Sequence, residues 1–192
     1  MEKQISNVCR TCIFHLRNIG SVRDLLTDNA AAQLVHSLVT SRLDYCNSLL
    51  YGLPDNKIKR LQRVQNIAAR IVSCSPKANH ITPVLRNLHW LPIRQCILFK
   101  VLLLAFKAYK QIAPEYLCNL IRLYEPSRSL HSSHQLMLVT PRTRLKTYGD
   151  RAFCSAAPRE WNNLPLTIRS CTSLDCFKSA LKTYLFKKAY DS

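Results

Sequence analysis

Glycine is scarce in this sequence, with 3 residues in a chain of 192. Phosphate-cradling loops and dinucleotide-binding folds depend on glycines at fixed spacings, so both are disfavoured. Long apolar runs are missing as well. The most apolar segment, 97–109, is interrupted by Lys100 and Lys107, and its longest charge-free apolar run is 101–106. A membrane-spanning helix needs about 20 apolar residues, so we expect no membrane partner.

The acidic residues are few and scattered. The 11 Asp and Glu residues include no adjacent pair, whereas clustered carboxylates are the usual basis of acid–base catalysis and of two-metal phosphoryl transfer. The Ser and Cys residues lack the glycine context of a nucleophile elbow. We therefore expect no catalytic residue, no cofactor and no small-molecule substrate, and an unrecognised enzyme is the least favoured class of function.

Cysteine is not scarce, but the 9 residues do not suggest a disulfide framework, because their number is odd. Cys9, Cys12 and His15 recur every third residue and resemble metal ligands. A structural zinc site needs four ligands, and three-residue steps drift by about 60° around a helix. We expect core cysteines, a surface or capping histidine and no metal site. Four further cysteines fall within or beside helical apolar patterns and are expected to act as small hydrophobic residues: Cys46, Cys74, Cys96 and Cys118.

The N-terminal segment does not look like a signal peptide, because Glu2, Lys3 and Arg10 interrupt it before an apolar core can form. We therefore expect reduced thiols and an intracellular protein, nuclear or cytoplasmic.

Apolar residues recur at helical spacing through most of the chain, which predicts a mainly α fold. The fold is expected to be a helical bundle around a central buried helix at about 92–112. The apolar residues of this helix cover nearly every direction around its axis, and Leu103 at its centre should be buried. Pro114 ends it. Five other helices are predicted in this part. They cover 3–19, the stretch from an N-cap at Thr27 or Asp28 to about residue 50, 57–73, a short stretch with Thr82 as N-cap, and a shorter stretch from Pro114 through Leu123.

The composition of the sequence changes after Tyr124. Pro126–Ser129 and His131–His134 form a polar linker, which predicts two domains, 1–125 and 126–192. The second is expected to be a small module that contains a short β-hairpin around Thr140-Pro141 and two helices. The last helix should begin with a capping box at Thr172 and Asp175.

Positive charge dominates the chain, with 28 Lys and Arg and a formal net charge of +17. Residues 56–114 contain 11 cations and no acid. Because a solvated surface normally mixes both signs, an acidic polymer is the expected partner. On the amphipathic helix 57–73, Lys59, Arg63 and Arg70 share one stripe. The candidate nucleic-acid contacts are Lys59, Arg60, Arg63, Arg70, Lys100, Lys107, Arg142 and Arg144.

Six further motifs stand along the chain. In order, they are Arg42-Leu43-Asp44-Tyr45-Cys46-Asn47, Leu61-Gln62-Arg63-Val64-Gln65-Asn66, His89-Trp90-Leu91-Pro92, Ala113-Pro114-Glu115-Tyr116-Leu117, Tyr148-Gly149-Asp150-Arg151-Ala152-Phe153 and Ala157-Pro158-Arg159-Glu160-Trp161-Asn162. Together they resemble the C-terminal part of the reverse transcriptase polyprotein of non-LTR (LINE-type) retrotransposons. The resemblance covers about 5–190. It implies the helical, thumb-like region after the polymerase palm, without the Asp-Asp motif of the catalytic site.

Two function classes remain in competition. The first is a non-catalytic remnant that grips the backbone of an RNA or DNA template and primer. The second is a protein-interaction module, or an inert fragment of a degraded mobile element with no selected role.

Overall fold

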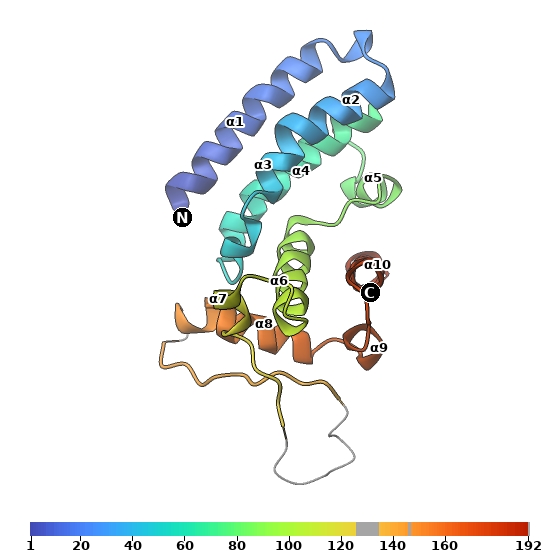
Figure 1. Cartoon of the computed structure of the whole chain (residues 1–192). Helices are drawn as coiled ribbons and strands as arrows, with labels where there is room; N and C mark the ends of the chain where they lie inside the picture. Colours follow the sequence, from blue (N-terminus) through green and yellow to red (C-terminus); the bar gives the residue numbers. More distant parts are fainter. Residues whose placement is uncertain (126–134, 146, 192) are drawn as a thin grey trace. The chain divides into compact units, whose positions relative to one another are not determined.

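The computed structural model describes residues 1–125, 135–145 and 147–191 (Figure 1). Within these ranges the chain is mainly α-helical and forms no β-strand, which confirms the predicted mainly α fold class. The predicted linker, Pro126–Ser129 and His131–His134, lies outside the described residues. In the described ranges, no helix combines the length and the apolar character needed to cross a membrane.

The chain divides into two compact units. Unit 1 consists of Met1–Ile97 with Lys188–Ser192, and unit 2 consists of Leu98–Lys187. The predicted boundary at residue 125 followed a change in composition, whereas the structure groups residues 98–125 with the C-terminal part. Packing explains the difference, because Phe106 stacks on Phe177 with ring centroids 4.3 Å apart. A composition change does not reveal which apolar faces meet.

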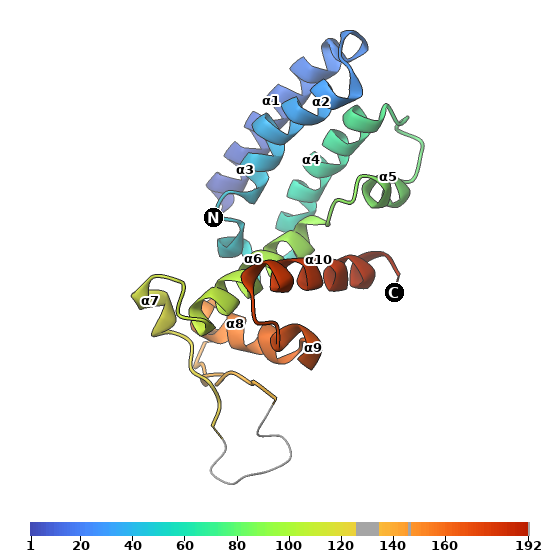
Figure 2. The ribbon, with the colours of Figure 1, turned by 45° about the vertical axis from the view of Figure 1, so that its right-hand side comes forward.

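Three helical segments run alongside one another in unit 1 (Figure 2). They are α1 (Glu2–Ser21), the pair α2 (Asp28–Val35) and α3 (Ser41–Asp44) joined by the π-helical turn η2 (His36–Thr40), and α4 (Asp55–Ser73). Each turns one apolar side toward the others. The core between them includes Ile5, Cys9, Cys12, Leu16, Val35, Val39, Leu61, Val64 and Ala68. Cys9 and Cys12 are thus core residues, as predicted.

The helix predicted from Thr27 to about residue 50 is shorter than expected. Thr27 is its N-cap, and its hydroxyl oxygen accepts from the Ala30 N–H at 3.3 Å. Cys46 has a left-handed backbone with φ of 52°, which a right-handed helix cannot contain. The chain therefore leaves α3 at Asp44 and continues as the short 3₁₀ helix η3 (Asn47–Leu50). Cys46 is exposed here, contrary to its expected role as a small hydrophobic residue.

The two ends of α1 and α4 fix these helices as a parallel pair. At one end Glu2 lies 3.2 Å from the Lys57 ammonium group. At the other end, Arg23, in the short 3₁₀ helix η1 (Arg23–Leu25), donates to the carbonyl oxygens of Ile71 and Val72 at 2.8 and 3.2 Å. These carbonyls belong to the last turn of α4, where a helix lacks internal donors and favours a cation.

Two capping predictions were wrong by a few residues. In α5 (Ile81–Asn87) the N-cap is His80, whose Nδ1 accepts from the Thr82 N–H at 3.4 Å. In α10 (Leu174–Tyr190) the first turn is capped by Ser173, whose hydroxyl accepts from the Cys176 N–H at 3.2 Å. In both places several residues able to cap stand together, and the sequence does not decide between them.

The predicted central helix is α6 (Ile93–Tyr109). Its buried residues include Ile97, Val101, Leu102, Ala105 and Phe106. Leu103, however, is only half-buried, whereas its neighbour Leu102 is 1% exposed. An all-apolar pattern gives no indication of which leucine faces inward.

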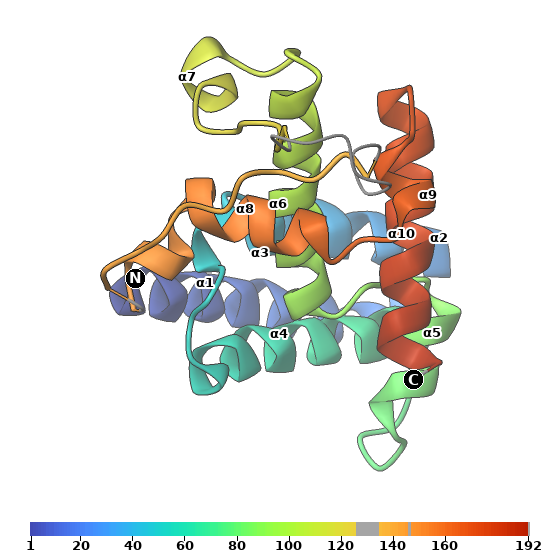
Figure 3. The same ribbon diagram turned by 90° about the horizontal axis from the view of Figure 1, so that it is seen from below.

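Unit 2 is built around an aromatic cluster. The remaining helices are α7 (Glu115–Cys118), η4 (Gly149–Arg151), α8 (Phe153–Asn162) and α9 (Leu166–Arg169). Figure 3 shows α8 crossing α6. At this crossing the Trp161 ring lies 6.4 Å from Phe106, 5.7 Å from Tyr109 and 5.7 Å from Phe177 of α10.

The predicted β-hairpin around Thr140-Pro141 does not form among the described residues. Leu138 instead pairs with Leu123 in an isolated antiparallel bridge. The side-chain amide of Asn162 both donates to the Leu138 carbonyl at 2.9 Å and accepts from its N–H at 2.8 Å. These contacts use the backbone groups of Leu138 that a hairpin partner would need.

Candidate nucleic-acid interface

The amphipathic character of α4 is as predicted, with one side in the core and one side exposed. Ile58, Leu61, Val64 and Ala68 are buried, and Lys59 and Arg63 are exposed. Neither cation forms an ion pair or a side-chain hydrogen bond within the described part of the chain. Lys59 and Arg63 are therefore available to an external anion.

Two other cations predicted on this helix are held by the protein itself. Arg60 donates to the Ser6 hydroxyl at 3.1 Å and lies 3.9 Å from a Glu2 carboxylate oxygen. Arg70 donates to the carbonyl oxygens of Lys77 and Asn79, at 3.4 and 3.0 Å. Arg60 thus joins α4 to α1, and Arg70 fastens the loop after α4.

Carboxylates from outside the acid-free segment compensate part of its charge. Lys57 pairs with Glu2, and Arg86 lies 2.9 Å from Asp191. Arg94 pairs with Asp55, the residue immediately before the segment. Around these three cations, carboxylates therefore offset part of the positive charge. Around Lys59 and Arg63, no ion pair among the described residues offsets it.

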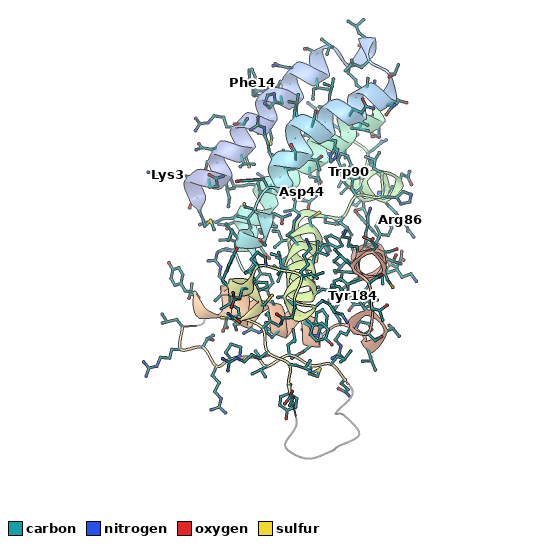
Figure 4. The ribbon with its side chains drawn as sticks, viewed as in Figure 1. Lys3, Phe14, Asp44, Arg86, Trp90 and Tyr184 are labelled. Carbon is teal, nitrogen blue, oxygen red and sulfur yellow. The ribbon has the colours of Figure 1, made fainter. Side chains whose placement is uncertain are left out.

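Helix α1 carries a second row of exposed cations that the sequence prediction missed. Lys3, Arg10 and Arg17 are seven residues apart, so they lie close to one line along the helix. All three are exposed, and none forms an ion pair or a side-chain hydrogen bond with another described residue. Phe14, between two of them, is 59% exposed. In Figure 4 the labelled side chains of Lys3 and Phe14 project from α1 away from α2.

The contacts between α1 and α4 show that both rows lie on the same side of the helix pair. On α1, Glu2 and Ser6 face α4, and each successive residue turns by about 100°. Lys3, Arg10 and Arg17 then lie about 40–80° to one side of that direction. On α4, Lys57 and Arg60 face α1. Lys59 and Arg63 lie about 110° from this facing direction, rotated in the sense opposite to that of the row on α1. In parallel helices, opposite rotations from the facing direction lead to the same side.

An independent contact supports this placement. Cys12 of α1 approaches the Val39 carbonyl at 3.9 Å, so the α2–α3 segment covers the other side of the pair. We call the side opposite to it the basic face. It is formed by Lys3, Arg10, Arg17, Lys59 and Arg63.

The remaining predicted contacts belong to unit 2. Lys100 and Lys107, on α6, are half-buried. Arg142 and Arg144 are exposed in the irregular segment after Thr140. The predicted set of eight residues is therefore divided between the two units, with four residues in each.

The motif Leu61–Asn66 contributes structural contacts beside Arg63. The Gln62 side-chain oxygen accepts from the Ile93 N–H at 2.9 Å, at the first residue of α6. The Gln65 amide donates to the Leu91 carbonyl at 2.9 Å. These two glutamines fix the start of α6 against α4 and are not part of the exposed face.

An apolar cavity of about 220 Å³ lies beside α1 and α3. Its lining includes Ile5, Val8, Leu43 and Leu61, and Arg42 and Tyr45 contribute to it as well. Tyr45 is 78% exposed. Among the described residues, no group of three or more His, Cys, Asp or Glu side chains is placed to hold a metal ion.

No protein-family model, no curated protein and no solved structure matches this chain.

Proposed function

We propose that unit 1 binds the sugar–phosphate backbone of RNA or DNA through the basic face and takes no catalytic part itself. The observation that carries this proposal is the position of five exposed, unpaired cations on one side of two adjacent parallel helices. Such an arrangement costs stability through repulsion between like charges, and a polyanion removes that cost.

The dimensions of the basic face suit a short stretch of backbone. Lys3 and Arg17 are about 21 Å apart along the axis of α1, since each helical residue rises about 1.5 Å. Neighbouring phosphates of one strand lie about 3.4 Å apart along a B-form duplex, so several fit this length. Contacts of this kind position a nucleic acid without reading its sequence. The exposed ring of Phe14 offers a base or sugar an apolar surface between Arg10 and Arg17.

Descent from a non-LTR retrotransposon reverse transcriptase is part of the proposal and rests on the sequence motifs. In that setting the basic face would grip template or primer on behalf of a polymerase. The competing class, a protein-interaction module or an inert fragment, requires no affinity for nucleic acid.

The test compares three double charge reversals by titration against labelled single-stranded and duplex nucleic acid at several salt concentrations. Lys59→Glu/Arg63→Glu alters the α4 row, and Arg10→Glu/Arg17→Glu alters the α1 row. Lys182→Glu/Lys187→Glu, at exposed positions of α10, is the matched control with the same change in net charge.

Each phosphate contact contributes about 0.7 (single strand) to 0.9 (duplex) to the slope of log K against log salt. Each of the first two variants should therefore lose about 1.4 to 1.8 units of slope and bind every sequence more weakly. The control should keep the parental slope. Equal losses in all three folded variants would mean that only net charge matters. Unchanged binding by the first two would favour the protein-interaction or inert-fragment class.

A further inference from the structure

Two cysteines of unit 2 are in contact. The Sγ atoms of Cys171 and Cys176 are 3.4 Å apart, and the Cys176 thiol donates to the sulfur of Cys171. Cys171 follows α9 and is 8% exposed, whereas Cys176 lies in the first turn of α10 and is exposed. Neither Cys171 nor Cys176 takes part in a disulfide.

The local backbone holds both cysteines in place. The Cys171 N–H donates to the Ile168 carbonyl at 3.3 Å, and its thiol approaches the Thr167 carbonyl at 3.7 Å. The Cys176 N–H donates to the Ser173 hydroxyl at 3.2 Å. The next residue, Phe177, is fully buried in the aromatic cluster. The two sulfur atoms are therefore fixed near each other by the end of α9 and the start of α10.

Little movement separates this pair from a covalent bond. A disulfide has an S–S distance of about 2.05 Å, so the sulfur atoms would have to approach by about 1.4 Å. Side-chain rotation of the exposed cysteine can supply part of that movement. By contrast, no second thiol contacts the exposed Cys46 or Cys74 within the described residues.

The two thiols differ in accessibility, and burial affects the protonation of Cys171. Cys176 can be reached from solvent, and Cys171 is shielded. Burial, with a smaller contribution from the neighbouring Cys176 thiol, raises the pKa of Cys171. Cys171 therefore stays protonated at neutral pH, and Cys176 is the sulfur that a soluble oxidant meets first.

We propose that Cys171 and Cys176 form a redox-modifiable dithiol that a peroxide converts into an intramolecular disulfide. The Cys176 thiol gives up its proton, and its sulfur attacks one oxygen of hydrogen peroxide. An S–O bond forms, the O–O bond breaks, and the departing hydroxide takes up a proton and leaves as water. The Cys171 sulfur then attacks the resulting sulfenic acid, and an S–S bond replaces the S–O bond. The hydroxyl group leaves as water with the proton of the Cys171 thiol. Overall, two thiols are oxidised by two electrons and one peroxide is reduced to two waters.

This site is independent of the basic face, which lies in unit 1. Failure of the nucleic-acid test would leave the dithiol proposal intact, and the reverse also holds.

The test uses the full chain, reduced and then titrated with hydrogen peroxide, alkylated, digested with trypsin and examined by mass spectrometry. Cleavage after Arg169 and Lys178 releases residues 170–178, which contain Cys171 and Cys176 and no other cysteine. This peptide should lose the mass of two hydrogen atoms and both alkylation sites, and a dithiol reductant should restore them. Cys46 and Cys74, on other tryptic peptides, should stop at sulfenic acid that dimedone labels.

Two comparisons make the test decisive. In Cys171→Ala, dimedone should label Cys176, because no second thiol resolves the sulfenic acid. In the parent, the internal disulfide should form at least about tenfold faster in the folded chain than in the guanidinium-unfolded chain, since the fold supplies the proximity. The proposal is overturned if residues 170–178 keep two alkylatable thiols while Cys46 and Cys74 are labelled. Equal rates in the folded and unfolded chain would overturn it too.

Discussion

At the scale of single residues, Asn162 shows how one amide replaces a strand partner. It donates to the carbonyl of Leu138 and accepts from the N–H of the same residue. Leu138 is 2% exposed, so water cannot substitute for these contacts. Asn163, the next residue, is exposed and provides a natural control.

Asn162→Ala should therefore lower the free energy of unfolding by about 2 to 4 kcal/mol, because two buried backbone groups lose their partner. Asn163→Ala should change it by less than about 0.5 kcal/mol. Denaturant unfolding of both variants under one set of conditions measures the difference. Similar free energies of unfolding for the two variants would mean that the N–H and carbonyl of Leu138 find other hydrogen-bond partners.

The free energy of unfolding depends on the ionisation of Tyr190. Its hydroxyl donates to the Trp90 carbonyl at 2.5 Å, and burial, with a smaller contribution from Cys96, raises the pKa of Tyr190 to about 12. In the unfolded chain the phenol would ionise near its ordinary pKa of 10.0, while the folded chain still retains the proton. The contribution of Tyr190 is therefore complete below about pH 10 and is lost as the pH rises through about 12.

Tyr190→Phe should lower the free energy of unfolding by about 1 kcal/mol at neutral pH, through loss of the hydrogen bond. The difference between parent and variant should shrink, and can change sign, between about pH 10 and 12. Parallel denaturant curves across this range cancel the titration of the lysines and other tyrosines. A constant difference would show that Tyr190 does not ionise differently in the folded state.

At the scale of elements, α6 shows the limit of an apolar pattern. Its position and its ends were predicted to within a few residues, because Pro92 and Pro114 enclose the apolar run. Which leucine is buried depends on neighbours far away in the sequence. The adjacent residues Leu102 and Leu103 differ in burial and make a matched pair.

Leu102→Asp places a charge in a site that is 1% exposed, at a cost of several kcal/mol. Since a domain has roughly 5–15 kcal/mol in total, this variant should be largely unfolded or insoluble. Leu103→Asp can turn its carboxylate toward water and should lose clearly less stability. Circular dichroism and thermal melting of the two variants provide the measurement. Equal melting temperatures would show that burial along α6 differs from that described.

The basic face is also a matter of how elements combine. Lys59 and Arg63 were predicted from the pattern of one helix, and the seven-residue spacing of Lys3, Arg10 and Arg17 is equally visible in the sequence. The parallel packing of α1 on α4 is not visible in the sequence. The sequence likewise does not show that Arg60 and Arg70 are engaged with Ser6 and with a loop.

At the scale of the whole molecule, charge alone does not locate a binding surface. Unit 1 contains 14 Lys and Arg against 6 Asp and Glu, and unit 2 contains 14 against 5. The two units are thus almost equally basic. Only the positions of the carboxylates distinguish an unpaired cation such as Arg63 from a paired one such as Arg86.

Unit 1 is assembled from two distant pieces of the chain, and this has a consequence for biosynthesis. Tyr190 bonds to the carbonyl of a residue 100 positions earlier, and Asp191 pairs with Arg86. A ribosome must therefore translate all of unit 2 before the contacts of Trp90 and Arg86 with these residues can form. Until then, the junction between α5 and α6 lacks these two contacts in the nascent chain. A premature stop codon just before Lys188 would therefore remove contacts from unit 1, although most of unit 1 is translated before unit 2.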